Sequence, residues 1–256
     1  MVAGKFAVVV VLISLCQSVL AATLADTVKQ IKPAVVGVGL VAPLATVSHQ
    51  LKGTGFVIGN GRYVVTNTHV IDMQVPEDVK YQRTVFAGHG KKGQILPVQK
   101  IYRDEEHDLA ILEIPTALPA LPLYDENEAI PDGTDIAVTG FPIGGVLGLY
   151  PATHKGIVAA YTPNIIAAKN TSQISEQFLQ RLRNPFMVYQ LDVVAYPGNS
   201  GSPVYRADTK EVFAVVNKVF VKETKESAIT RPSGITYAIP ASHISALARK
   251  HGIPLQ

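Results

Sequence analysis

The segment from Pro197 to Pro203 (PGNSGSP) places a serine between glycines. Glycines allow a tight turn that exposes the hydroxyl of Ser200. In such a turn the backbone N–H groups of Gly198 and Ser200 can point together at the negative charge that develops on a reacting carbonyl oxygen. One turn would then supply both a nucleophile and an oxyanion hole. The same residues also suit a purely structural turn between strands, so the segment needs partners before it indicates chemistry.

A nucleophilic serine needs a base within hydrogen-bonding reach, normally a histidine that a buried carboxylate orients. His69 is the strongest candidate among the seven histidines, because it lies in the run of residues 63–70 (YVVTNTHV), a predicted strand followed by a turn. The other six lie in polar or turn-rich segments, where we expect surface or capping roles: His49, His89, His107, His154, His243 and His251.

Asp108 is the candidate carboxylate, because it opens the alternating run of residues 108–114 (DLAILEI) and can turn inward beside His69. The alternative is a solvated turn aspartate, which is what we expect for the acidic residues 104–106 just upstream. His107 competes with His69 as the base. As the neighbour of Asp108 on an extended chain, however, it would point the opposite way.

Short β-rich runs, separated by turn residues, dominate the chain. The low aromatic content of 7% and the lack of tryptophan agree with strands and turns rather than long helices. We predict six strands in the first half, at residues 33–42, 55–58, 63–66, 84–87, 95–101 and 109–114. We predict six more in the second half, at residues 135–139, 156–161, 187–194, 202–205, 212–221 and 235–239.

Two helices and a connector frame these strands. Residues 24–32 have helical apolar spacing and stop at Pro33, and residues 241–251 form a C-terminal helix. The proline-rich residues 115–131 connect two units. The sequence therefore predicts an all-β fold of two closed six-stranded antiparallel barrels, about residues 33–115 and 132–240, because closure removes exposed strand edges.

Residues 172–183 (SQISEQFLQRLR) interrupt the strand pattern with apolar residues on one helical face. We predict a surface helix within a long loop. Its place before the strand that leads to Ser200 leaves a regulatory or substrate-gating role open.

The first 21 residues have the pattern of a signal peptide: Lys5, then an apolar stretch, then small residues. We predict cleavage after Ala21 or Ala22, a mature domain of residues 22–256, and export to a bacterial periplasm or the outside. A membrane anchor is the alternative, but the apolar stretch is shorter than the roughly 20 residues that a spanning helix needs. Because cleavage removes the apolar stretch, we expect no stable membrane insertion of the mature chain. Cys16, the one cysteine, lies within the removed segment, so we also expect no disulfide.

Charge and motif content argue against several function classes. The formal net charge is only +3, the basic residues are scattered, and no aromatic residues are interleaved with them, so nucleic acid is not an expected partner. We find neither the clustered ligand spacing of a metal site nor a phosphate-binding glycine loop. We therefore expect no metal and no organic cofactor.

Six blocks, taken together, resemble the trypsin-like serine peptidases, closest to the HtrA/Deg and V8-like glutamyl endopeptidase branches. They occur in the order of that family and span nearly the whole predicted mature chain: residues 53–58 (GTGFVI), 64–71 (VVTNTHVI), 108–112 (DLAIL), 138–142 (VTGFP), 156–158 (GIV) and 198–203 (GNSGSP). The order histidine, aspartate, serine is that of the chymotrypsin group.

The resemblance implies chymotrypsin-type barrels and a role for each site residue. His69 would be the general base, Asp108 its orienting carboxylate and Ser200 the nucleophile, with Gly198 and Ser200 as oxyanion donors. Ser202 replaces the second glycine of the HtrA motif, as it does in the V8-like branch. Because only seventeen residues follow Ile239, we expect no appended PDZ domain.

The resemblance also indicates where the substrate side chain would bind. In this fold the pocket is lined by the segment just before the nucleophile and by the strand that follows it. Here the first segment supplies Val194 and Ala195, and the strand supplies Val216 and Asn217. These residues carry no carboxylate, so we predict a preference for small or medium aliphatic side chains. If the strand register shifts by one residue, the ammonium group of Lys218 would lie near the pocket and favour substrates with acidic side chains.

Two functions follow as hypotheses. The first is an endopeptidase that cleaves polypeptides through an acyl-enzyme intermediate, without a cofactor. The alternative is a peptide-binding or chaperone-like module on a protease fold. Such modules generally lose a triad member, whereas all three positions here hold the required residue. An esterase, as a third possibility, would use the same chemistry. The sequence makes no prediction of the oligomeric state.

Overall fold

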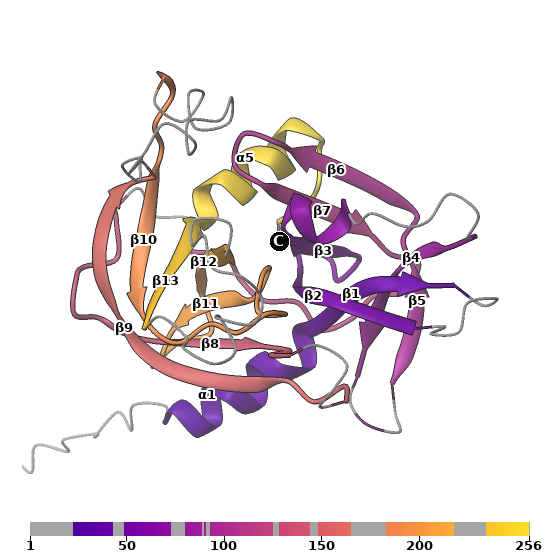
Figure 1. Ribbon diagram of the computed structural model, residues 1–256, viewed down its shortest axis with the longest axis horizontal. Helices are drawn as coiled ribbons and strands as arrows, with labels where there is room; N and C mark the ends of the chain where they lie inside the picture. Colours follow the sequence, from indigo (N-terminus) through magenta and orange to yellow (C-terminus); the bar gives the residue numbers. More distant parts are fainter. Residues whose placement is uncertain are drawn as a thin grey trace, which may run out of the picture.

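The computed structural model describes residues 23–42, 49–72, 80–88, 90, 93–124, 128–143, 148–164, 183–217 and 234–255 (Figure 1). The predicted signal peptide lies outside the described residues, as does the predicted helix at 172–183 except for its last residue. None of the helices in the described part of the chain is long and apolar enough to cross a membrane.

The first unit is a seven-stranded antiparallel sheet with the order β5-β4-β1-β2-β3-β7-β6. The helix α1 (Leu24–Ile31) and a short 3-10 turn, η1 (Lys32–Ala34), lead into it. Its strands are β1 (Val35–Val41), β2 (His49–Ile58), β3 (Tyr63–Thr66), β4 (Gln82–Ala87), β5 (Gln94–Pro97), β6 (Lys100–Asp104) and β7 (Leu109–Glu113), with the one-turn helix α2 (Thr68–Ile71) after β3.

This unit is a curled seven-stranded sheet and not the closed six-stranded barrel that was predicted. The predicted strand at 95–101 is divided into β5, which pairs with β4, and β6, which pairs with β7. Between them, Val98 donates its N–H to Arg83 (3.0 Å) and Gln99 donates its N–H to Glu113 (2.8 Å). The run therefore leaves one partner strand and joins another within two residues, and the sheet curls between its two edges.

The second unit is a closed barrel of six strands, as predicted, with the order β10-β13-β12-β11-β8-β9. Its strands are β8 (Asp135–Gly140), β9 (Ala152–Pro163), β10 (Met187–Asp192), β11 (Pro203–Arg206), β12 (Val212–Asn217) and β13 (Ile235–Pro240). The predicted C-terminal helix is confirmed as α5 (Ala241–Lys250). The described part of the predicted connector at 115–131 has no strand beyond a single bridge from Leu123 to Val212.

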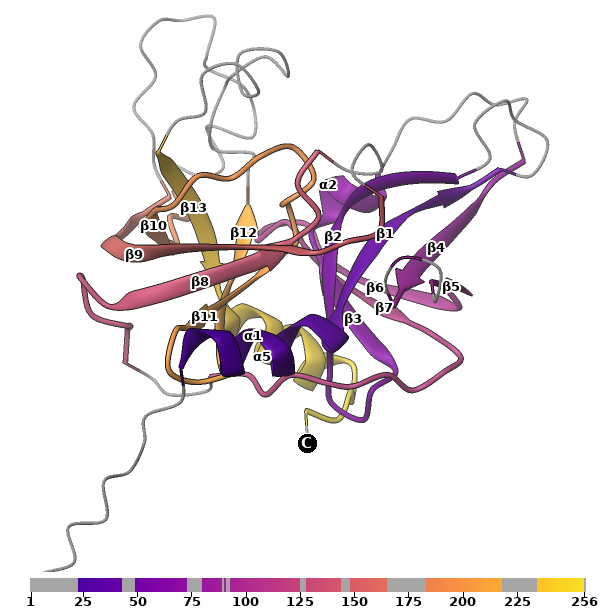
Figure 2. The ribbon, with the colours of Figure 1, turned by 90° about the horizontal axis from the view of Figure 1, so that it is seen from below.

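Two apolar clusters form the core, and strand alternation divides β12 between them. Ala214 and Val216 belong to the cluster inside the closed barrel, together with Val204, whereas Val215 between them belongs to the larger cluster of the first unit. That larger cluster also includes Ile244 of α5. Helix α5 contacts β6 of the first unit as well as β12 and β13 of the barrel, and Figure 2 shows it below the strands of both units. The helix therefore joins the two units through shared apolar packing.

Candidate active site

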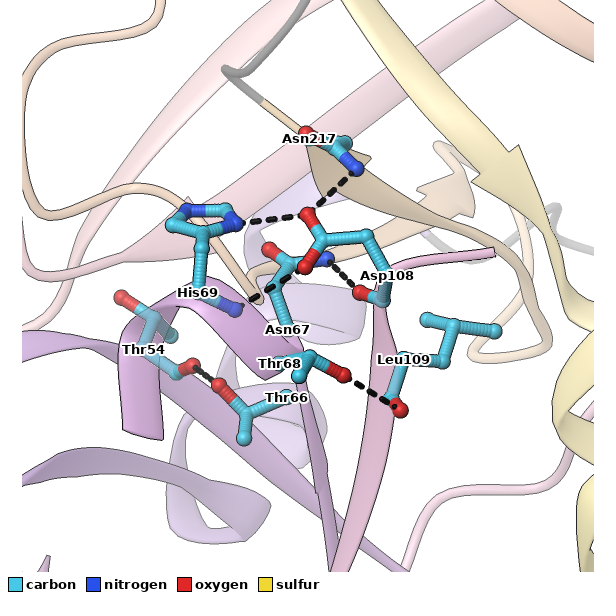
Figure 3. Close-up of polar contacts among 8 residues, drawn as sticks. All are labelled: Thr54, Thr66, Asn67, Thr68, His69, Asp108, Leu109 and Asn217. Carbon is cyan, nitrogen blue, oxygen red and sulfur yellow. Dashed lines mark hydrogen bonds and ion pairs between the residues drawn. The ribbon is translucent and has the colours of Figure 1, made fainter. Parts of the chain in front are cut away.

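His69 and Asp108 form a paired contact (Figure 3). One carboxylate oxygen of Asp108, Oδ1, accepts the backbone N–H of His69 at 2.9 Å. The other oxygen, Oδ2, lies 2.6 Å from Nδ1 of the imidazole. Two contacts from one carboxylate fix both the position and the ring orientation of the histidine, and they favour the tautomer with its proton on Nδ1. The other ring nitrogen is then available as a proton acceptor.

The backbone around these two residues explains the alignment. Asp108 has a positive φ of 52°, a conformation that aspartate tolerates better than most residues. Its carbonyl oxygen accepts hydrogen bonds from the side-chain amide of Asn67 (3.1 Å) and the N–H of Thr68 (3.2 Å). The Thr68 hydroxyl donates to the carbonyl of Leu109 at 2.8 Å. The turn that carries His69 is therefore bound directly to the start of β7 (Figure 3).

Asn217 contacts the same carboxylate from the second unit. It is the last residue of β12, and its Nδ2 donates to Asp108 Oδ2 at 2.9 Å (Figure 3). The sequence predicts a place for Asn217 in the substrate pocket and does not predict this contact with Asp108. The sequence carries one sign of a special role: Asn217 is a polar residue at the end of a strand whose other residues are apolar and buried.

The other predicted pocket residues lie in different surroundings. Val216 is fully buried in the core of the closed barrel. Val194 and Ala195, just after β10, remain partly exposed. Pocket roles for these residues stay predictions.

The Ser200 turn lies against β2 of the first unit. Thr54 of β2 donates its N–H to the carbonyl of Ser200 (2.8 Å), and its hydroxyl donates to the carbonyl of Gly198 (2.7 Å). The same hydroxyl accepts the N–H of Phe141 at 3.0 Å. One buried threonine thus binds two points of the turn and the end of β8. Ser200 retains 7% of its surface.

Gly53 brings the serine turn close to the residue that follows His69. A Cβ placed on Gly53 would lie 2.7 Å from Val70 Cγ1 and 3.1 Å from the Ser200 carbonyl oxygen, so both neighbours flank this glycine. Among the residues that the structure describes, no hydrogen bond joins the His69 imidazole to the Ser200 hydroxyl. The Ser200 carbonyl and the Val70 side chain both lie next to Gly53.

Two peptide groups of the turn are held in fixed orientations. The Pro197 carbonyl accepts the N–H of Ile143 at 2.6 Å, and the Asn199 carbonyl accepts the N–H of Ser202 at 3.0 Å. In a trans peptide the C=O and the following N–H point in opposite directions. The N–H groups of Gly198 and Ser200 are therefore directed away from these partners, and within the described residues neither donates to another protein group.

His107 pairs with a different acid. Its Nδ1 lies 2.7 Å from Asp104 Oδ2, so it is bound to Asp104 instead of competing with His69 for Asp108. This corrects the expectation that Asp104 is a solvated turn residue. The described residues contain no group of three or more histidine, cysteine or acidic side chains that could hold a metal ion.

Comparison with known proteins identifies the family. The trypsin-like peptidase domain matches residues 53–215, well over half of the chain, and this range includes His69, Asp108 and Ser200. The chain belongs to the trypsin-like peptidase family. The resemblance inferred from the sequence blocks is confirmed.

Curated relatives of this chain include HtrA and DegP proteins. The probable periplasmic serine endoprotease DegP-like of Halomonas elongata is 27% identical over 189 residues, which cover 73% of this chain and 32% of the relative. Serine protease HTRA1A of Danio rerio is 28% identical over 227 residues, which cover 86% of this chain and 40% of the relative. The chain thus spans about a third to two fifths of the length of these relatives.

A solved structure shares the architecture of this chain. The crystal structure of Rv3671c protease from M. tuberculosis, in its active form, matches with a TM-score of 0.61 and 23% identity. The match covers 89% of this chain and 84% of that chain. This likeness confirms the predicted chymotrypsin-type fold.

We predict that Gly201→Ala is far more destabilising than a matched glycine substitution. Gly201 has a φ of 84°, and a Cβ there would lie 2.0 Å from the Thr54 carbonyl oxygen. Gly133→Ala is the control, because Gly133 has a φ of 83° but no atom within 4 Å of its Cβ position. We expect Gly133→Ala to cost about 1–2 kcal/mol of unfolding free energy, and Gly201→Ala at least about 3 kcal/mol. Urea unfolding measures both, and equal losses would contradict the tight docking of the serine turn on Thr54.

Proposed function

We propose that the chain is a serine endopeptidase whose catalytic triad is His69, Asp108 and Ser200. The observation that carries the proposal is the paired contact between Asp108 and His69, at 2.9 and 2.6 Å, in a chain of the trypsin-like peptidase family. A carboxylate bound in this way orients the imidazole as a base and stabilises the imidazolium that forms during the reaction. The contact from Asn217 to Asp108 Oδ2 supplies a further donor to the carboxylate.

The proposed reaction proceeds through an acyl-enzyme. The oxygen of Ser200 attacks the carbonyl carbon of the peptide bond, and Nε2 of His69 takes the hydroxyl proton. The C–N bond then breaks, and His69 returns that proton to the leaving amine. Water, deprotonated by His69, then attacks the ester carbonyl carbon. The bond between that carbon and the Ser200 oxygen breaks, His69 returns the proton to the Ser200 oxygen, and the second product leaves as a carboxylic acid. The protons balance within these residues and water, so no cofactor is needed.

The orientation of two peptide groups supports an oxyanion hole at Gly198 and Ser200. Their N–H groups are directed away from the bonds that hold the Pro197 and Asn199 carbonyls. Two such donors stabilise the negative charge on the carbonyl oxygen in the transition state, where removing one typically costs about 100-fold to 1000-fold in kcat.

A peptide-binding module with little activity is the second candidate. One observation favours it: the described structure has no hydrogen bond between His69 and Ser200. Catalytic hydrogen bonds are often long before substrate binds, so turnover must discriminate between the two functions.

Polypeptides are the proposed substrates, and export is proposed from residues 1–21 and from the names of the relatives. The relatives from Halomonas elongata and Hahella chejuensis are both named as probable periplasmic serine endoproteases. We also propose that Val194 and Ala195 line the pocket for the substrate side chain, where an apolar lining favours aliphatic groups.

We predict that Ser200→Ala abolishes cleavage of casein with little change in melting temperature, because alanine removes only the hydroxyl from this site. Asp108→Asn should lower kcat by about 10⁴-fold, because an amide in place of the carboxylate favours the wrong histidine tautomer. Rates and thermal unfolding curves measured on the same preparations test both effects. Cleavage by Ser200→Ala at the original rate would place the nucleophile elsewhere, and an unaltered chain without turnover would favour the binding module.

We predict cleavage after valine, alanine, isoleucine or leucine. Each methylene that the pocket buries contributes about 0.8 kcal/mol until the pocket is full. Mass spectrometry of a digested peptide library gives the preference directly. Dominant cleavage after acidic or basic residues would contradict an apolar pocket at Val194 and Ala195.

A further inference from the structure

A second aspartate–histidine pair lies next to the proposed triad. Asp104 Oδ1 accepts the N–H of His107 at 3.1 Å, and Asp104 Oδ2 lies 2.7 Å from His107 Nδ1. This two-contact arrangement repeats the one between Asp108 and His69. The side chains of Asp104 and His107 are 21% and 17% exposed, so the pair is more buried than the first, at 22% and 34%.

This second pair holds the turn that ends at Asp108. Asp104 is the last residue of β6 and lies opposite Leu109, the first residue of β7. His107 directly precedes Asp108, the residue with the positive φ of 52°. The two contacts of Asp104, one with the N–H and one with Nδ1 of His107, therefore fix the backbone and the side chain of the residue that precedes the carboxylate aligning His69.

Aromatic rings connect the same turn to the second unit. The His107 ring stacks on His243, with centroids 3.8 Å apart and an interplanar angle of 26°. Phe186 packs edge-on against both rings, at 4.7 Å from His107 and 5.4 Å from His243. His243 lies in the first turn of α5, and Phe186 precedes β10. Helix α5 and β6 lie next to each other in Figure 1.

The charges in this cluster are compatible with close packing. Burial, followed by repulsion from His107, lowers the pKa of His243 to about 4, so its ring is neutral at pH 7. Burial acts to raise the pKa of Asp104, but hydrogen bonds from His107 outweigh it and hold that pKa below the ordinary value. The cluster therefore contains the charged carboxylate of Asp104, which is bound to His107, and the neutral imidazole of His243, which stacks on His107.

We propose that Asp104, His107 and His243 form a positioning cluster that holds Asp108 in line with His69 and links that alignment to the packing of α5. The proposal rests on the proposed function of Asp108 and His69. In this proposal the three residues act through the turn that ends at Asp108 and not through contact with the substrate.

Two variants separate the hydrogen bond from the ring packing. His107→Phe keeps a ring between His243 and Phe186 but removes the Nδ1 contact with Asp104. His243→Ala removes the stacked ring that α5 provides. His251→Phe is the matched control, because the His251 ring lies just after α5 and packs on Tyr102 of β6 (4.9 Å) rather than on the turn.

We predict that His107→Phe and His243→Ala each lower kcat for a peptide substrate by roughly tenfold to a hundredfold, with KM changed less than about twofold, because misalignment of catalytic groups affects the chemical step. The short contact between His69 and Asp108 should give a strongly deshielded proton resonance, assigned by its absence in His69→Ala. This resonance should shift or disappear in both variants and stay unchanged in His251→Phe.

An unchanged kcat and an unchanged resonance in a folded variant would overturn the proposal. A fall in kcat that only matches the loss of folded protein, with the resonance unchanged, would overturn it too. If His243→Ala does not fold, His107→Phe still tests the proposal because it keeps the apolar packing. If the unaltered chain cleaves no peptide, the proposed function fails, whereas the resonance still tests the cluster.

Discussion

The carboxylate of Asp108 is the constraint on which the other parts of the site depend. It binds His69 at two points and Asn217 at a third, so its position joins the first unit to the second. A partly buried charge of this kind is stable only when donors surround it. The pairing of β3 with β7 brings those donors to the carboxylate, because Thr66 lies opposite Ala110 and the two chain segments then diverge into the turn of His69 and the turn of Asp108.

Thr54 has the corresponding role for the serine turn. Its hydroxyl and N–H bind the carbonyls of Gly198 and Ser200, and the hydroxyl also accepts the N–H of Phe141. Thr54 is buried, so removal of its hydroxyl would leave the Gly198 carbonyl and the Phe141 N–H without this hydrogen-bonding partner. The two units therefore meet through a few polar contacts at the site and through apolar packing, which includes α5 and barrel residues such as Tyr205 and Val215.

Local patterns predicted most of the fold, because strand alternation and turn residues are properties of neighbouring residues. The six-stranded barrel, the C-terminal helix and the family were predicted correctly. The division of residues 95–101 into β5 and β6 was missed, because it depends on which strands Val98 and Gln99 meet. For the same reason the sequence did not predict the contact of Asn217 with Asp108, which are far apart in the chain. The pair formed by Asp104 and His107 is local, within one turn, and was missed because Asp104 was expected to be solvated. Catalytic roles for His69, Asp108 and Ser200 remain proposals.

The central claim is that one serine, Ser200, is activated by a histidine that Asp108 holds in place. Treating the purified chain with a fluorophosphonate and mapping the adduct by peptide mass spectrometry tests it most directly, because this reagent needs an activated serine and almost no substrate pocket. The account predicts a single adduct on the peptide that contains Ser200, formed much more slowly in Asp108→Asn. An adduct on another residue, or no adduct on the folded chain, would contradict it.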